Sequence, residues 1–228
     1  MLTMSYRGQL EIKFHPGAFS SKSAVSAEEK ANLPIELTFA KGKATSPIAS
    51  LVLQSLQQHL ATVQQPKIAP STLLRFISTA WDRSISLENE ARMLEFCGVT
   101  RLTLSSPKDN KSLSLCARCT LLGNTTVSST PGRKGAAAKN EAKRIDVDFT
   151  VRTRIKHDNN DTQDIGYMDF DIDALASKVY GFGSGNKVGL PVVEMQSILG
   201  KNLSLEEGEA LGNGVWCKAV QKLTGSVF

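Results

Sequence analysis

Residues 71–96 have the sequence STLLRFISTAWDRSISLENEARMLEF. Apolar side chains recur there every three or four positions over about seven turns, which is the period of an amphipathic α-helix. Ser71 is expected to cap the start of this helix, and Gly98 is expected to end it at the C′ position. The apolar positions occupy adjoining rows, so we expect the helix to pack on two sides as a strut between two small domains. These positions are Leu73, Leu74, Ile77, Ala80, Trp81, Ile85, Leu87, Ala91 and Leu94.

The sequence before this helix predicts a small sheet with a second helix over it. Apolar and polar residues alternate at 10–14 and again at 35–39, which indicates two half-buried strands. Ser46 and Pro47 form a helix-start signal, and apolar residues follow at helical spacing as far as Val63. Two strands cannot fold alone, so we expect the helices to cover one of their faces.

After Gly98 the apolar period changes from helical spacing to two, which predicts a meander of four strands. The fold class is therefore expected to be α+β, with antiparallel sheets covered by helices. We expect an N-terminal domain of residues 1–98 and a C-terminal domain of residues 99–228. The expected strands lie near 102–104, 113–121, 145–155 and 165–172, with a flexible loop at 124–143, a turn at 158–161 and helices near 191–199 and 205–223.

Composition is typical of a globular, water-exposed protein. Of 228 residues, 41% are hydrophobic and 21% are charged, so the chain has enough apolar residues for a core. No apolar run approaches the roughly 18 residues of a membrane span. The net charge of +5 is uneven, because much of the excess lies between Arg133 and Arg144. The strand-like pattern begins almost at the first residue, which suggests a piece of a longer protein.

The four cysteines, Cys97, Cys116, Cys119 and Cys217, are expected to be reduced thiols of a nuclear or cytosolic protein. Cys116 and Cys119 have the CxxC spacing of some zinc sites. However, a structural zinc site needs four converging ligands, and residues three apart on a strand point to opposite faces. We therefore predict ordinary strand cysteines and no metal.

Catalytic signals are weak. The glycine-rich segment 181–189, which contains Lys187, matches neither a dinucleotide fingerprint nor a P-loop, and a connector is favoured over a phosphate cradle. A nucleotide-binding enzyme that uses this segment remains an alternative. His15, His59 and His157 precede no evident nucleophile. We accordingly predict no catalytic residue and no cofactor.

A row of basic residues lies at the end of the strand expected at 145–155, where Arg152, Arg154 and Lys156 share one face. Asp169, Asp171 and Asp173 alternate on the next strand in the same way. Cross-strand charge pairing explains the acidic row more simply than a metal site does. Together with the basic loop, this row leaves weak nucleic-acid binding as an alternative. Aromatic residues make up only 6% of the chain, however, and their positions form no platform for stacking bases.

Several stretches, taken in order, resemble the C-terminal globular region of the outer-kinetochore scaffold family, known as blinkin in animals and as the Spc-type scaffold in fungi. The likeness is to the fungal branch and covers nearly the whole chain. Two features depart from that family pattern: the loop at 124–143 is longer, and an insert at 183–189 separates Val179-Tyr180-Gly181 from the helix that follows. The stretches are YRGQLEIKFHPGAF (Tyr6–Phe19), LPIELTF (Leu33–Phe39), Leu51–Leu60, the Trp81-bearing helix, Ile145–Val151, KVYG (Lys178–Gly181), and the helix with Met195, Leu199, Gly200 and Lys201.

The resemblance implies tandem RWD domains at the nuclear kinetochore, in a scaffold without catalytic activity. Such a region anchors the scaffold to the Mis-type (MIND) complex by capturing a C-terminal tail, while a coiled-coil kinetochore partner binds upstream sequence. Neither a membrane nor a nucleic-acid partner is expected. We expect the tail to add along the second sheet, where Arg152, Arg154 and Lys156 would face it if it is acidic. Reversing these three charges is then expected to weaken binding without changing thermal stability.

Overall fold

A computed structural model describes residues 1–19, 34–42, 46–105, 113–126, 140–157, 165–180, 190–203 and 211–227. Within these residues the chain is α+β, as predicted, with four α-helices and two antiparallel sheets of three and four strands. The sheet orders are β1–β2–β3 and β4–β5–β6–β7. The elements are β1 (Leu2–Tyr6), β2 (Leu10–Phe14), η1 (Pro16–Phe19), β3 (Ile35–Phe39), α1 (Pro47–Thr62), η3 (Gln65–Lys67), α2 (Pro70–Met93), η4 (Leu94–Phe96), β4 (Val99–Ser105), β5 (Ser114–Thr126), β6 (Asn140–Lys156), β7 (Tyr167–Tyr180), α3 (Val192–Leu203) and α4 (Val215–Val227).

The chain forms two compact units that alternate along the sequence. Unit 1 contains residues 1–85, 104–114 and 152–171, and unit 2 contains residues 86–103, 115–151 and 172–228. Helix α2 and all four strands of the second sheet contribute residues to both units. This division differs from the expected single cut after residue 98, because the strands are long enough to belong to both. A division into two folding domains stays a prediction.

The sheet of unit 1 contains the two predicted strands, β2 and β3, and a third strand that was not predicted. Strand β1 pairs antiparallel with β2, from Leu2 opposite Phe14 to Tyr6 opposite Leu10. Arg7 and Gly8 close the hairpin with φ of 52° and 65°, the left-handed conformation that hairpin turns require. Apolar Leu2, Met4 and Tyr6 alternate with polar Thr3 and Ser5 along β1, as is typical of a strand, although most of its residues are exposed.

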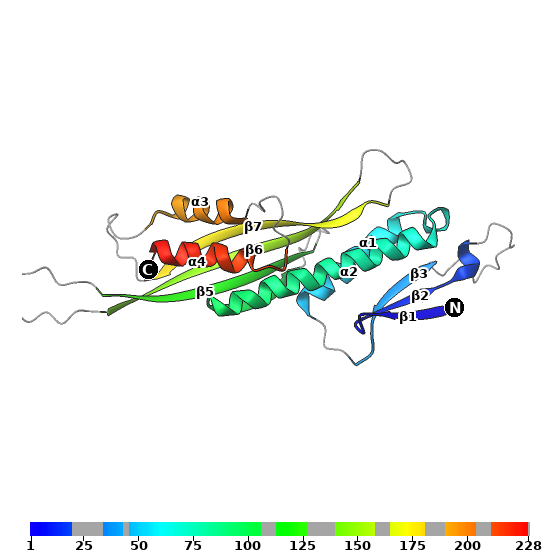
Figure 1. Ribbon diagram of the computed structural model, residues 1–228, viewed down its shortest axis with the longest axis horizontal. Coiled ribbons are helices and arrows are strands. Elements are labelled where there is room, and N and C mark those ends of the chain that lie inside the picture. The colour runs from blue at the N-terminus through cyan, green and yellow to red at the C-terminus, as the bar shows by residue number, and fades with distance from the viewer. Residues whose placement is uncertain are drawn as a thin grey trace, which may run out of the picture. The chain divides into compact units, whose positions relative to one another are not determined.

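Helices α1 and α2 supply the cover that the sheet of unit 1 needs (Figure 1). The predicted cap of α1 is confirmed, because the Ser46 hydroxyl accepts a hydrogen bond from the Ala49 N–H at 3.0 Å. Trp81 of α2 is completely buried, and its ring meets the edge of Phe39 with centroids 6.2 Å apart. The buried side chains around them form the core of this unit: Leu10, Ile12, Ile35, Leu37, Ile48, Leu51, Val52, Leu56, Leu60, Leu73 and Ile77.

In unit 2, helices α3 and α4 lie side by side on the sheet (Figure 1, orange and red). Trp216 of α4 stacks on Phe149 of β6 with ring centroids 4.6 Å apart and an interplanar angle of 5°. Such a pair contributes about 0.5–1.5 kcal/mol beyond the area that it buries. The predicted inward face of β6 is confirmed, since Ile145, Val147, Phe149 and Val151 are all buried.

The end of α2 differs from the prediction. The α-helix ends at Met93 and continues as the 3₁₀ turn η4, and Gly98 does not adopt the left-handed conformation of a C′ glycine. A side chain at Gly98 would instead overlap the backbone carbonyl oxygen of Thr120 on β5. Glycine is therefore needed here for close approach of two backbones rather than for a helix cap.

The start of α4 was also predicted wrongly, because the helix begins at Val215 rather than at Leu205. Gly212 and Gly214 have φ of 103° and 79°, which are not helical. The reason is Glu90, a fully buried carboxylate on α2. Its oxygens accept hydrogen bonds from the N–H groups of Gly212, Gly214, Val215 and Trp216 at 2.7, 2.8, 3.2 and 3.1 Å. A carboxylate at a helix start satisfies N–H groups that have no partner within the helix.

The loop predicted at 124–143 is shorter than expected, because β5 extends to Thr126 and β6 begins at Asn140. The rest of that loop, the turn predicted at Asp158–Asp161 and the glycine-rich segment at 181–189 lie outside the described residues. In the described part of the chain, no helix combines the length and the apolar character needed to cross a membrane.

We predict that Glu90→Ala lowers the free energy of unfolding by at least about 3 kcal/mol, because it leaves several buried N–H groups without an acceptor. Urea denaturation measures this loss. The control is Glu95→Ala at an exposed position of η4, which should cost no more than about 0.5 kcal/mol. Equal effects of the two substitutions would contradict the role assigned to Glu90.

Candidate protein-interaction site

The predicted basic row lies in unit 1, and two of its members, Arg154 and Lys156, form ion pairs with Asp169 and Asp171 of the acidic row. Arg154 lies 2.7 Å from Asp171 and 3.7 Å from Asp169, and Lys156 also forms an ion pair with Asp169. Arg83 of α2 approaches Asp169 from a different element, at 3.1 Å. The predicted cross-strand pairing is therefore confirmed for Arg154 and Lys156. Because these side chains are ion-paired within the sheet, they offer less positive charge to an acidic partner than unpaired side chains would.

The pKa of Asp169 reflects this pairing. Burial alone would raise it, but the hydrogen bonds from Lys156 and from the Phe170 N–H, together with the charges of Lys156 and Arg83, outweigh burial and lower the pKa below its ordinary value. Because the folded-state pKa lies below the unfolded one, this carboxylate stabilises the fold above about pH 4, and the contribution is lost as the pH falls through the folded-state pKa.

The position of β6 restricts how a tail can reach these residues. Strand β6 lies between β5 and β7, so both of its edges have neighbouring strands. The expected addition of a tail along the second sheet therefore cannot use an edge of β6, because strand addition needs an open edge, and the outer strands of this sheet are β4 and β7. Of the three predicted residues, Arg154 borders a hollow of about 280 Å³, which it lines with residues that include Ser55, His59 and Thr153.

Unit 2 carries a similar charge network on its part of β5 and β6. Arg144 holds Asp146 through two hydrogen bonds of 2.9 and 2.8 Å, and Arg118 holds Asp148 in the same way at 2.6 and 2.8 Å. The hydrogen bond from Arg144 lowers the pKa of Asp146, further helped by Thr120. Arg144, the last residue of the basic stretch, is thereby engaged within the fold, which weakens the nucleic-acid alternative.

Strand β3 is an outer strand of the three-stranded sheet, and side chains from α1 and η3 occupy part of its outer edge. The backbone groups of the even-numbered residues of β3 point toward β2. This follows from two hydrogen bonds at the ends of the pairing, from His15 N–H to the Pro34 carbonyl and from Ala40 N–H to the Gln9 carbonyl. The backbone groups of Ile35 and Leu37 therefore point outward. Gln65 accepts from the Ile35 N–H at 2.9 Å, and Gln57 donates to the Leu37 carbonyl at 2.9 Å.

Strand β1 is the opposite outer strand, and its open side has no such cover. The same alternation directs the backbone of Leu2, Met4 and Tyr6 toward β2, so Thr3 and Ser5 present their N–H and C=O groups outward. Within the described residues, no hydrogen bond from another residue reaches the outward backbone groups of Thr3 or Ser5. An edge of this kind can accept another strand.

Apolar side chains lie beside this open edge. Leu2, Met4 and Tyr6 share the sheet face of the buried Leu10 and Ile12, yet Leu2 is 58% and Met4 is 41% exposed. Helix α2 covers only the Tyr6 end, where the Tyr6 hydroxyl donates to Asp82 at 3.0 Å. The helix layer therefore stops short, and an apolar strip borders the edge. Strand β1 also lacks the charges and prolines with which proteins block such edges.

The outer strands of the second sheet, β4 and β7, are less suited than β1 to pairing with an added strand. On β7, Arg83 donates to the Met168 carbonyl at 2.6 Å, and the Gln196 amide fits the Ala174 carbonyl at 2.9 Å and the Ala176 N–H at 2.8 Å. On β4, the exposed positions are mostly polar: Val99, Arg101, Thr103 and Ser105. Strand β7 also exposes apolar side chains, Leu175 and Val179, but Arg83 and Gln196 occupy part of its outer backbone, whereas the outward groups of Thr3 and Ser5 on β1 have no described partner.

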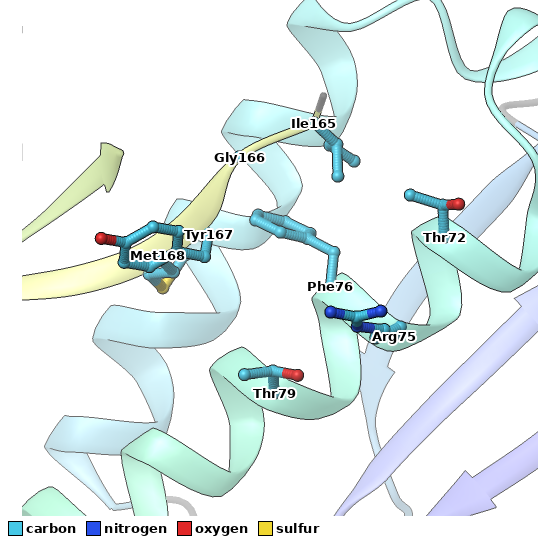
Figure 2. Close-up of a pocket in the computed structure, with 8 residues that line it drawn as sticks. All are labelled: Thr72, Arg75, Phe76, Thr79, Ile165, Gly166, Tyr167 and Met168. Atoms are coloured by element: carbon cyan, nitrogen blue, oxygen red, sulfur yellow. The ribbon is translucent and has the colours of Figure 1, made fainter. Parts of the chain in front are cut away.

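A pocket of about 270 Å³ lies in unit 1 between α2 and the start of β7 (Figure 2). The Phe76 ring points into it from α2, and Thr72, Arg75 and Thr79 occupy the same side of that helix. Ile165, Gly166, Tyr167 and Met168 form the opposite wall. Hydroxyl groups, one guanidinium and aromatic rings suit the binding of a polar or anionic side chain. No carboxylate, imidazole or thiol is among the lining residues.

The cysteine and histidine residues considered as metal or catalytic candidates pack within the fold. Cys119 is buried in β5, whereas Cys116 lies on the opposite face with Arg118, as predicted for residues three apart on a strand. His59 packs on Phe76 and contacts the Ile165 carbonyl at 3.1 Å, and burial lowers its pKa. In the described ranges, no three His, Cys, Asp or Glu side chains come together as metal ligands would.

Sequence reasoning missed both Glu90 and the open edge. Glu90 follows Leu87 by three residues and precedes Leu94 by four, so helical spacing alone places its charge on the buried stripe, and that placement is a usable signal. Strand β1 also carries a usable signal, because Leu2, Met4 and Tyr6 alternate with Thr3 and Ser5, but the sequence does not show that its outer edge is open. Comparisons with protein-family models, with curated proteins and with solved structures each find no match to this chain.

We predict that Lys156 and Asp169 stabilise each other by about 0.5–1 kcal/mol, as expected for a partly exposed pair. A double-mutant cycle of Lys156→Gln and Asp169→Asn, measured by urea denaturation at pH 6, gives this coupling. The coupling should shrink as the pH falls through the lowered folded-state pKa of Asp169, because protonation removes the negative charge. Lys156→Glu should lower the thermal midpoint, contrary to the expectation from sequence. Additive effects at pH 6 would show that the pair contributes nothing.

Proposed function

We propose that this chain is a non-catalytic protein-interaction module that anchors a kinetochore scaffold to the Mis-type (MIND) complex, in support of chromosome segregation and spindle-checkpoint signalling. A nuclear, kinetochore location and a tandem RWD-like arrangement belong to the same proposal. Its basis in the sequence is the ordered resemblance to the outer-kinetochore scaffold family. Helices covering an antiparallel sheet in each unit are compatible with it.

The observation that carries the interaction role is the open edge of β1. An extended tail that pairs with β1 gains main-chain hydrogen bonds at Thr3 and Ser5, and its alternate side chains can cover Leu2 and Met4. The matching tail therefore has apolar residues at positions i and i+2. Stacked Phe14 and Phe19, with centroids 5.1 Å apart, extend the apolar surface next to Leu2.

The size of the exposed strip favours a peptide over a folded partner at this edge. Two half-exposed side chains provide much less than the roughly 800 Å² per partner of a standard protein interface. Main-chain pairing supplies affinity without a large area, which is how strand addition works in known recognition modules. The basic row remains a proposed second contact for an acidic part of the tail. Its residues are Arg152, Arg154 and Lys156, and the contact would use the positive charge that ion pairing within the sheet does not neutralise.

We predict that Thr3→Pro weakens tail binding at least tenfold, because proline removes the outward N–H and its ring obstructs an incoming strand. Fluorescence anisotropy with labelled C-terminal tail peptides of the Mis-type complex subunits measures the affinity. Thr3→Ala, which keeps the N–H, is the matched control and should bind like the unmodified chain.

Met4→Lys should also weaken binding, while Arg154→Gln tests the basic row separately. Thermal melts of all variants establish that each is folded. Tail binding that is unchanged in Thr3→Pro but reduced in Arg154→Gln would move the site to the basic row. An absence of binding by every tail peptide would reject the kinetochore assignment.

A further inference from the structure

Two cysteine side chains from distant parts of the sequence meet in unit 2. The Sγ atoms of Cys97 and Cys217 are 3.0 Å apart, although 120 positions separate them in the chain. Cys97 follows η4 and Cys217 lies in the first turn of α4. Both side chains are partly exposed, so a small reagent in solvent can reach them.

The fold holds both residues in place. The Cys97 N–H donates to the Leu94 carbonyl at 2.9 Å, which closes the 3₁₀ turn. Glu90 fixes the first turn of α4 through its four hydrogen bonds, one of which comes from Trp216, the residue before Cys217. A disulfide bond is about 2.05 Å long, so the two sulfur atoms need to approach by only about 1 Å.

We propose that Cys97 and Cys217 form a redox-modification site, which a low-molecular-weight disulfide such as oxidised glutathione converts into an intramolecular disulfide. This inference goes beyond the proposed function and does not depend on it. The juxtaposition of the two sulfur atoms within unit 2 carries it.

The chemistry balances with glutathione as the only co-reactant. One cysteine loses its proton, and its thiolate attacks a sulfur of oxidised glutathione, forming a mixed disulfide and releasing one glutathione thiolate, which takes up a proton. The second cysteine then loses its proton and attacks the protein sulfur of the mixed disulfide. The protein S–S bond forms, the second glutathione leaves and is protonated, and two protein thiols are oxidised while one glutathione disulfide is reduced.

The environment of Cys97 sets the pH dependence of this reaction. Burial, followed by the hydrogen bond with Cys217, raises the pKa of Cys97 to about 12. Because the thiolate is the nucleophile, Cys97 reacts slowly near pH 7 and faster as the pH rises toward that value. Cys119 lies nearby, but it is fully buried, and burial raises its pKa to about 11, so it is protected from reagents in solvent.

The test is oxidation of the whole folded chain in a glutathione redox buffer at pH 8. Peptide mass spectrometry without reduction should find Cys97 joined to Cys217. Closing a loop of this length should raise the thermal midpoint by about 5–10 °C, and dithiothreitol should reverse the rise. Cys97→Ser and Cys217→Ser should each abolish the shift, whereas Cys116→Ser, on the opposite face of β5, should retain it.

Two results would overturn the proposal. One is recovery of Cys97 and Cys217 as separate glutathione adducts. The other is recovery of both as free thiols under conditions in which Cys116 is modified. The serine variants are close in size to cysteine, and their melts in dithiothreitol show whether they fold, so a missing disulfide can be distinguished from a misfolded protein.

Discussion

The carboxylate of Glu90 is the contact on which the organisation of unit 2 depends. Burying a charged group is costly unless hydrogen bonds compensate, and here four backbone N–H groups do so. These donors come from the segment that leads into α4, so the carboxylate fixes where that helix begins. Once α4 begins at Val215, Trp216 stacks on Phe149 and Cys217 lies beside Cys97. One side chain thus links the end of α2 to the packing of the C-terminal helix.

In unit 1 the corresponding constraint is the supply of hydrogen-bond partners for the sheet edges. Gln57 and Gln65 occupy part of the outer edge of β3, because their amides bond the Leu37 carbonyl and the Ile35 N–H. The helix layer does not extend over β1 in the same way, which leaves a backbone edge and an apolar strip together. The proposed interaction follows from that difference between two edges of one sheet, and it does not rest on a charged patch.

Charged residues mainly organise the sheets themselves. Strand alternation places Arg154 and Lys156 opposite Asp169 and Asp171, and the same principle places Arg118 opposite Asp148. A net charge of +5 therefore does not translate into a basic face in these strands. Composition overstates how much positive charge is available to a partner, because pairing between strands depends on register, which composition does not record.

The sequence by itself determined the α+β class, the strands at 10–14 and 35–39, the Ser46 cap of α1, the inward face of β6 and the pairing of the basic and acidic rows, because each follows from local periodicity or from a local capping residue. Only the tertiary structure decided the pairing of β1 as an outer strand, the start of α4, the role of Gly98 and the meeting of Cys97 with Cys217. Each of these depends on groups far apart in the chain: a neighbouring strand for β1, Glu90 for α4, Thr120 for Gly98, and 120 intervening residues for the thiol pair. Local patterns carry no information on such distant partners, which is why the candidate edge and the thiol pair emerged only from the folded chain.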